Sequence, residues 1–345
     1  MTNEWQTFLS QHGGNVDEIG QIIFSDSRRD DTAKLDSGCH IASLDHLGVI
    51  HVTGGDAQAF LQAQLSNDIN LIDQSASQIS AYCNPKGRML AQFLIIPAGN
   101  EYYLLFAKAL MEKTLMRLRM FVLRSQVTLT DVSNEIVCTG VIGTQLDELN
   151  MPLPGSDYGM TTSEQMFITK IPSTPSRFLV LSSLDKAKEF WKQLTTANCN
   201  AVSSHAWSWL DIQAGLPNIQ AETVEEFVPQ MLNLELIGGV NFKKGCYPGQ
   251  EIVARMHYLG KPKRRMFKLH TENEDVPKPG EDLYLHGGDG QSAGKVVMAQ
   301  PSATKGTDLL AVIRLNHANS NELRLRSADG AQLSFGSLPY SLEAN

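Results

Sequence analysis

The sequence lacks a long hydrophobic run. No stretch approaches the roughly 18 consecutive apolar residues of a membrane-spanning helix, so we predict no transmembrane segment and no membrane partner. The N-terminus is polar and partly acidic, without the basic start and apolar core of a signal peptide. We therefore expect a cytoplasmic protein.

Cysteine is scarce and scattered. The five cysteines are odd in number, widely spaced and without a CxxC pair, and a reducing compartment disfavours disulfides, so no structural disulfide is expected. A zinc site or iron–sulfur cluster needs several clustered ligands, so no metal site is expected either. The cysteines are Cys39, Cys83, Cys138, Cys199 and Cys246.

The chain also lacks an excess of positive charge and several well-known catalytic signatures. Its net charge is −8, so any contact with nucleic acid must be local. No GxSxG, P-loop or GxGxxG pattern supports a hydrolase, nucleotidase or dinucleotide-binding enzyme. The 345 residues, 42% apolar and 19% charged, are typical of a globular protein of two or three domains.

Hydrophobic patterns predict alternating strands and helices, which favours an α+β fold. We expect a helix and then a loop within residues 1–35, a loop at 150–164, and a small β barrel or sandwich at 262–345. Asp56 is the expected N-cap of a helix. The other predicted strands are 49–53, 79–83, 89–96, 102–106, 127–129 and 135–143, and the helices are 57–66, 110–123, 185–194, one from Ser203 or Ser204 to near Gly215, and one starting at Gln250.

One segment concentrates unusual residues. Two glycines bracket Cys246-Tyr247-Pro248, and glycine and proline together predict a tight, well-defined loop. Between Lys243 and Lys268 there are eight basic residues and one acidic residue. The motif residues are Lys244, Gly245, Cys246, Tyr247, Gly249, Gln250 and Glu251.

The residue types leave two interpretations open for Cys246 and two for the basic run that follows it. Lys243 and Lys244 precede Cys246, and nearby positive charge favours a reactive thiolate, although most free cysteines are small buried apolar residues. The basic run 261–268 is either a solvated linker or a phosphate-contacting surface for tRNA.

The string from Lys244 to Glu251, followed by Val253-Ala254-Arg255, resembles the hallmark of the YgfZ family. The resemblance covers roughly residues 40–343 and includes, besides that string, Gly54-x-Asp56-Ala-x-x-Phe60, Lys86-Gly87, Ala214-Gly-Leu-Pro217, Phe227-Val-Pro-Gln230, Asn233-Leu234 and Leu338-Pro-Tyr-Ser-Leu-Glu343.

The YgfZ family is in turn similar to the glycine-cleavage T-protein, a tetrahydrofolate-dependent aminomethyltransferase. The resemblance implies an α+β, three-domain ring around a folate pocket, with a C-terminal β barrel. It also implies a folate-binding accessory protein that supports iron–sulfur enzymes or their assembly factors and tRNA modification such as methylthiolation, with at most weak or indirect tRNA contact. The expected parts are an extension at 1–40, α+β domains at 41–145 and 146–261, and the barrel at 262–345.

The chain departs from the T-protein at the catalytic position. The T-protein carries a pair of aspartates after the turn that contains Gly87, and the corresponding positions here are Ala91 and Gln92. Without a carboxylate, proton transfer at the folate amine is unexplained. Aminomethyl transfer is therefore not expected. An active one-carbon transferase and a tRNA-binding module remain the alternatives.

A pocket for tetrahydrofolate or a one-carbon derivative of it needs an aromatic or apolar slot and basic groups. Trp207 falls where the family places a folate-stacking tryptophan, and a second family tryptophan corresponds to Leu47. Lys244 and Arg255 are candidates for the glutamate carboxylates. Gln230 and Asn233 are candidates for the pterin edge, and Cys246 is the candidate functional thiol.

Overall fold

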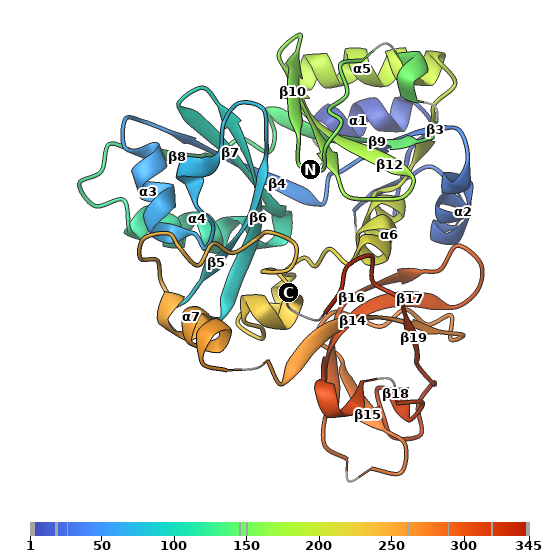
Figure 1. Ribbon diagram of the computed structural model, residues 1–345. Helices are drawn as coiled ribbons and strands as arrows, with labels where there is room; N and C mark the ends of the chain where they lie inside the picture. The colour runs from blue at the N-terminus through green and yellow to red at the C-terminus, as the bar shows by residue number, and fades with distance from the viewer. Residues whose placement is uncertain are drawn as a thin grey trace. The chain divides into compact units, whose positions relative to one another are not determined.

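The computed structural model describes residues 4–17, 20–25, 27–144, 146–149, 151–260, 262–288, 290–318 and 320–342. Its fold is mixed α and β, as expected (Figure 1). Contacts divide the chain into two compact units, neither of them continuous in sequence. The first unit holds residues 1–57, 71–78 and 94–210, and the second holds 58–70, 79–93 and 211–345. The four-part domain division expected from the sequence stays a prediction.

The first unit is built on a six-stranded sheet in the order β10-β11-β12-β9-β3-β13. Helices α1 and α5 cover one face of this sheet (Figure 1), and their apolar side chains, Trp5 and Trp191 among them, form one core with β9 and β12. The bounds are α1 Glu4–Gln11, β1 Asn15–Val16, β2 Ile22–Ile23, α2 Arg28–Ala33, β3 Cys39–Ser43, β9 Ile136–Gly143, β10 Met160–Ser163, β11 Met166–Ile171, β12 Ser176–Ser183, α5 Leu184–Thr196, β13 Asn200–Val202 and α6 Ser204–Ala214.

A second, five-stranded sheet has the order β5-β6-β7-β4-β8. The division between the units passes along β6, after Phe93. The predicted strands and helices of this region are present with ends shifted by a few residues. Their bounds are β4 Leu47–Thr53, α3 Ala57–Gln64, β5 Gln78–Cys83, β6 Met89–Ala98, β7 Glu101–Ala107, α4 Met111–Met120 and β8 Thr128–Asp131.

The C-terminal β region is a six-stranded sheet that curls into a half-barrel (Figure 1), in the order β18-β15-β16-β17-β14-β19. Alternating apolar residues of β14, β16 and β17 fill its own core. The strands are β14 Arg264–Thr271, β15 Asp282–Leu285, β16 Gly294–Pro301, β17 Thr307–Arg314, β18 Leu323–Leu325 and β19 Ser334–Gly336, and helix α7 Gln250–Tyr258 precedes them.

The expectation of no disulfide is wrong, because Cys39 and Cys199 are bonded to each other. The reason lies in strand pairing that spacing could not reveal. The short strand β13 runs parallel to β3 with Asn200 opposite His40, which places the two preceding cysteines side by side. Cys83, Cys138 and Cys246 are free.

Three local expectations also need correction. The N-terminal region contains the hairpin β1–β2 and helix α2 besides the first helix. The Ser27 hydroxyl caps α2 by accepting a hydrogen bond from the Asp30 amide. The predicted loop at 150–164 ends in strand β10. The carboxylate of Asp56 accepts from the Gln126 amide instead of capping α3.

Candidate functional site

The loop that carries the motif is held by close packing of two glycines in the second unit. Gly249 has a φ of 84°, and a Cβ on it would lie 2.5 Å from the carbonyl oxygen of Asn84 and 2.6 Å from the Cα of Gly87. Only glycine fits at position 249, because both the backbone conformation and the space exclude a side chain. The turn Asn84–Gly87 therefore packs directly against the start of α7, in agreement with the tight loop expected there.

Lys244 anchors the other end of the loop. Its side chain is buried (the residue is 7% exposed), and Nζ donates to the carbonyl oxygen of Gln62 at 2.6 Å and to that of Leu65. These carbonyls lie at the end of α3, where a helix leaves acceptors unpaired and attracts positive charge. Burial lowers the pKa of Lys244 to about 8. Its ammonium therefore ties the motif to α3.

Cys246 is exposed and lies between two buried residues. Lys244 is anchored on one side, and on the other the Tyr247 ring is buried with the Lys244 ammonium 5.1 Å from its centre. The Gln250 amide closes the loop by donating to the Lys244 carbonyl at 3.3 Å. The interpretation of Cys246 as a buried apolar residue is thus excluded, and the loop presents one thiol to solvent on a fixed backbone.

Gln230 and Asn233 are buried and tie elements of the second unit together. Gln230 lies in the 3₁₀ turn η6 (Pro229–Leu232) and donates from Nε2 to the Val253 carbonyl of α7 at 2.6 Å. Asn233 donates to the Met266 carbonyl of β14 at 2.8 Å. Their amide oxygens are buried without a hydrogen-bond partner among the described residues. These two side chains join η6 to α7 and to β14, and their contact with a pterin stays a prediction.

Trp207 and Leu47 belong to the first unit, and the other predicted site residues belong to the second. Trp207 is 3% exposed, and the guanidinium carbon of Arg177 lies 4.5 Å from its ring centre. A Cβ on Gly140 of β9 would lie 2.5 Å from the indole, so the ring packs on bare backbone. Leu47 is half-buried at the start of β4. Their stacking on folate stays a prediction.

The positions that replace the T-protein aspartates lie on β6. Ala91 is fully buried, whereas Gln92 is half-buried with its Oε1 atom shielded from solvent. That oxygen has no hydrogen-bond partner among the described residues. Because buried acceptors are nearly always paired, an unpaired one calls for an explanation.

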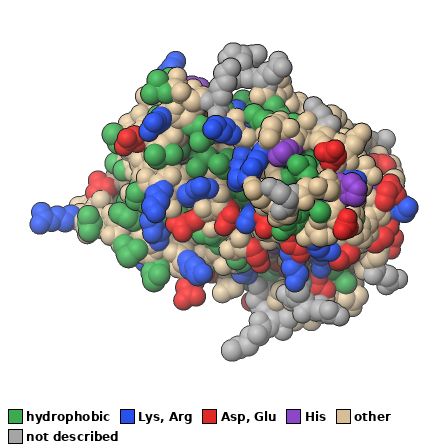
Figure 2. Space-filling model, turned by 90° about the horizontal axis from the view of Figure 1, so that it is seen from below, with side chains coloured by type: hydrophobic (Ala, Val, Ile, Leu, Met, Phe, Trp, Pro, Cys, Tyr) green, Lys and Arg blue, Asp and Glu red, His purple; other side chains and the backbone are tan. Residues whose placement is uncertain are grey.

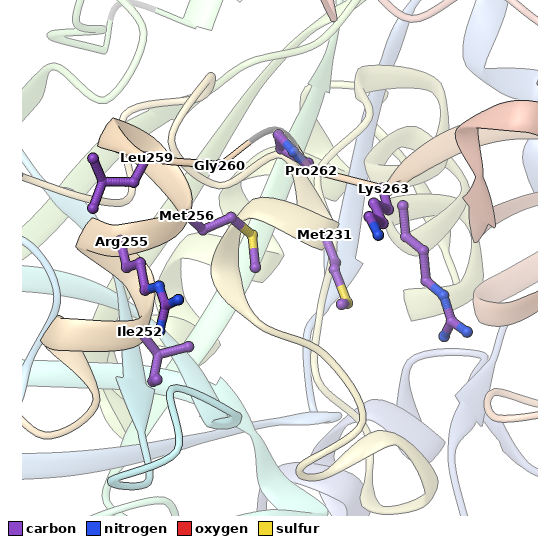
Figure 3. A pocket seen from close by; sticks show the side chains of 9 residues that line it. Met231, Ile252, Arg255, Met256, Leu259, Gly260, Pro262 and Lys263 are labelled. Atoms are coloured by element: carbon purple, nitrogen blue, oxygen red, sulfur yellow. The ribbon is translucent and has the colours of Figure 1, made fainter.

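The structure also shows a hollow beside α7 that the sequence reasoning missed. Its volume is about 560 Å³ (Figure 3). The signal was present in the sequence: Ile252, Arg255, Met256 and Leu259 follow the i, i+3, i+4, i+7 spacing of one helix face. The remaining described lining residues are Met231, Gly260, Pro262, Lys263 and Arg264. Lys261 of the basic run lies outside the described residues.

Two classes of feature are absent from the part of the chain that the structure describes. No group of three or more His, Cys, Asp or Glu side chains there could hold a metal ion. None of the described helices is both long and apolar enough to cross a membrane.

Comparison with known proteins gives three matches. Residues 15–171 match the family of the GCVT N-terminal domain. A "tRNA-modifying protein YgfZ" of Photorhabdus laumondii subsp. laumondii is 31% identical over 308 residues, which cover 88% of this chain and 92% of that protein. One of Enterobacter sp. (strain 638) is 30% identical over 307 residues, covering 88% and 94%.

A solved structure extends the comparison to the whole fold. The glycine cleavage system aminomethyltransferase T from Bartonella henselae matches with a TM-score of 0.80 at 17% sequence identity, over 97% of this chain and 96% of that one. The fold is therefore that of the glycine-cleavage T-protein class, and the fold expected from the resemblance is confirmed. Within that class, the identity and coverage of its relatives show that the chain belongs to the YgfZ family.

Proposed function

We propose that the protein binds tetrahydrofolate or a one-carbon derivative and supports iron–sulfur enzymes that modify tRNA, including methylthiolating enzymes. The observation that carries the proposal is the exposed Cys246 on a loop held by buried Lys244 and Tyr247. Such a loop suits a thiol that acts on a partner protein, since one cysteine cannot hold a cluster alone. The names of the relatives support the connection to tRNA modification.

Gln92 supports folate binding without catalysis. The pterin ring of a folate carries several N–H groups, and the unpaired Oε1 of Gln92 is an acceptor for one of them. An amide accepts a hydrogen bond but does not take up a proton near neutral pH. Because Ala91 offers no carboxylate either, the chain keeps a binding group and lacks the base that aminomethyl transfer requires.

The other proposed contacts follow the family resemblance. Trp207 and Leu47 remain candidates for contact with the flat rings. Of the two proposed cations, Arg255 is exposed, whereas the ammonium of Lys244 already binds two carbonyls. Arg255 is therefore the better candidate for a glutamate carboxylate.

Titration with tetrahydrofolate, followed by tryptophan fluorescence and confirmed by calorimetry, tests the binding. We expect saturable binding that Gln92→Ala weakens about tenfold, the effect of one lost hydrogen bond. Gln58→Ala, on the exposed side of α3, is the matched control and should bind like the unmodified protein. No saturable signal from the unmodified protein would refute the folate proposal.

Complementation of cells that lack the protein tests the thiol. We expect Cys246→Ala to restore little of the methylthiolated tRNA nucleoside, measured by mass spectrometry. Cys83→Ala is the control, because burial raises the pKa of that thiol to about 12 and keeps it unreactive. Full restoration by Cys246→Ala would remove the thiol from the mechanism.

A further inference from the structure

Helix α7 presents an uncovered apolar stripe. Ile252 and Leu259 are 39% and 84% exposed, and Met256 lies between them on the same face. In Figure 3, Met256 extends from α7 toward the segment that carries Met231. Figure 2 shows that hydrophobic side chains are exposed beside Lys and Arg side chains on the face that it presents. An exposed, helix-spaced stripe of large apolar residues marks an interaction surface.

Buried hydrogen bonds within the second unit hold the walls of this groove. The Gln230 amide fastens η6, which carries Met231, to α7. Arg265 fastens η6 to β14 by donating to the Gln230 carbonyl at 3.0 Å, and it also pairs with Glu235. α7 and η6 are therefore joined, and η6 is joined to the strand that follows Lys263. A groove formed before binding loses little entropy when it is filled.

The charged residues among the described lining of the groove are all basic. Arg255, Lys263 and Arg264 line it, and none of its described lining residues is acidic. None of the three forms an ion pair with another described residue, while the chain as a whole has a net charge of −8. The groove therefore joins an apolar floor to unpaired cations, and the complementary surface is apolar with carboxylates at its edges.

We propose that the groove binds an acidic amphipathic helix of a partner protein. Such a helix lays its apolar face between Met231 and the α7 stripe and places its carboxylates against Lys263 and Arg264. Because Leu259 is almost fully exposed, the groove is open along α7, whereas a small-molecule pocket encloses most of its ligand.

The lining disfavours two other occupants. Its described residues include no aromatic ring on which a nucleobase could stack, so single-stranded RNA fits poorly. A flat lipid surface would leave the hollow between Met231 and α7 unfilled, whereas a helix fills it, so a lipid surface fits poorly as well. Apart from Arg255, which is also the proposed contact for a folate carboxylate, the described lining residues have no part in the folate and thiol roles proposed above.

A synthetic peptide of about four helical turns, with leucines at i, i+3, i+4 and i+7 and glutamates on the flanks, tests the proposal. We expect saturable binding by fluorescence anisotropy that weakens as salt is raised. Leu259→Asp and Arg264→Glu should each weaken it about tenfold or more. Peptides with lysine for glutamate, or serine for leucine, should not bind.

Matched surface changes complete the experiment. Leu123→Asp replaces a leucine of almost equal exposure, 86%, and Lys278→Glu reverses an exposed charge outside the groove; both should bind the peptide normally. Absence of saturable binding, equal loss in Leu123→Asp, or tighter binding of a single-stranded RNA would each overturn the proposal. Folate binding itself would remain a separate measurement.

Discussion

Replacing Lys244 by methionine distinguishes an anchoring lysine from a ligand-binding one. Methionine keeps most of the apolar stem and removes the ammonium that binds the Gln62 and Leu65 carbonyls. A hydrogen bond from a charged donor contributes about 1.5–3 kcal/mol. The cost of burying the charge offsets part of this stabilisation. We therefore expect Lys244→Met to lower the free energy of unfolding of the second unit by about 2–4 kcal/mol.

Thermal unfolding and hydrogen exchange measure this loss. At about 2–4 °C per kcal/mol for a unit of this size, Tm should fall by several degrees, and the amides of α3 should exchange faster. The neighbouring Lys243 is exposed, so Lys243→Met is the control and should stay within about 0.5 kcal/mol of the unmodified protein. Equal stability of the two variants would refute the anchoring role. Weaker folate binding by Lys244→Met at unchanged Tm would show that Lys244 is a ligand group.

Two further substitutions test the packing and the disulfide, and a change of pH tests the buried titratable groups. Gly249→Ala should lower the free energy of unfolding by roughly 2–4 kcal/mol in chemical denaturation, because the added methyl group collides with the turn at Asn84. The same variant should slow or alter the reaction of Cys246 with a thiol reagent. An unchanged unfolding transition would contradict this packing. Cys39→Ser should lower the stability of the first unit by up to about 5 kcal/mol, the limit for a disulfide that closes a loop of 160 residues. The unmodified protein should lose the same stability when a dithiol reductant is added. If neither the substitution nor the reductant changes stability, the disulfide is absent. On acidification from pH 6.5 to 4, the first unit should lose stability, as followed by urea titrations. Burial lowers the pKa values of His46 and His205 to about 4, so in this range these two histidines take up protons only in the unfolded chain, which destabilises the fold. Burial raises the pKa of Asp45 to about 6, so this carboxyl takes up its proton first in the folded state. That proton offsets the destabilising effect of one histidine. The net loss is about 1.4 kcal/mol per pH unit between pH 6 and 4, and a flat profile would contradict it.

The anchoring of Lys244 changes how the motif is understood. Sequence proximity suggested that Lys244 assists Cys246 through its charge. The structure places the Lys244 ammonium on the end of α3, so its contribution to the thiol is positional: it holds the backbone on one side of Cys246, as Tyr247 does on the other. A variant of either anchor should therefore affect the thiol through loop order.

Local sequence patterns predicted much of the fold and part of the site. The strands and helices of the region around β4–β8 and of the C-terminal sheet appear close to where alternation and helical spacing placed them, because those patterns reflect which side of each element is buried. The bracketing glycines predicted a tight loop, and Gly249 does adopt a left-handed conformation. The two failures have different reasons. The Asp56 carboxylate binds the amide of Gln126, which is distant in sequence. Strand β10 pairs with the adjacent strand β11, which the local pattern had not predicted.

By itself, the sequence determined the α+β class, the family, the loop around Cys246 and the absence of a carboxylate at Ala91 and Gln92. These depend on residue identity and on spacing over a few residues. Only the tertiary structure decided that Cys39 pairs with Cys199 and that Lys244 caps α3, because each joins residues more than 150 positions apart. It also decided that the apolar stripe of α7 is exposed beside cations that have no ion-pair partner among the described residues, since exposure depends on what the rest of the chain packs against.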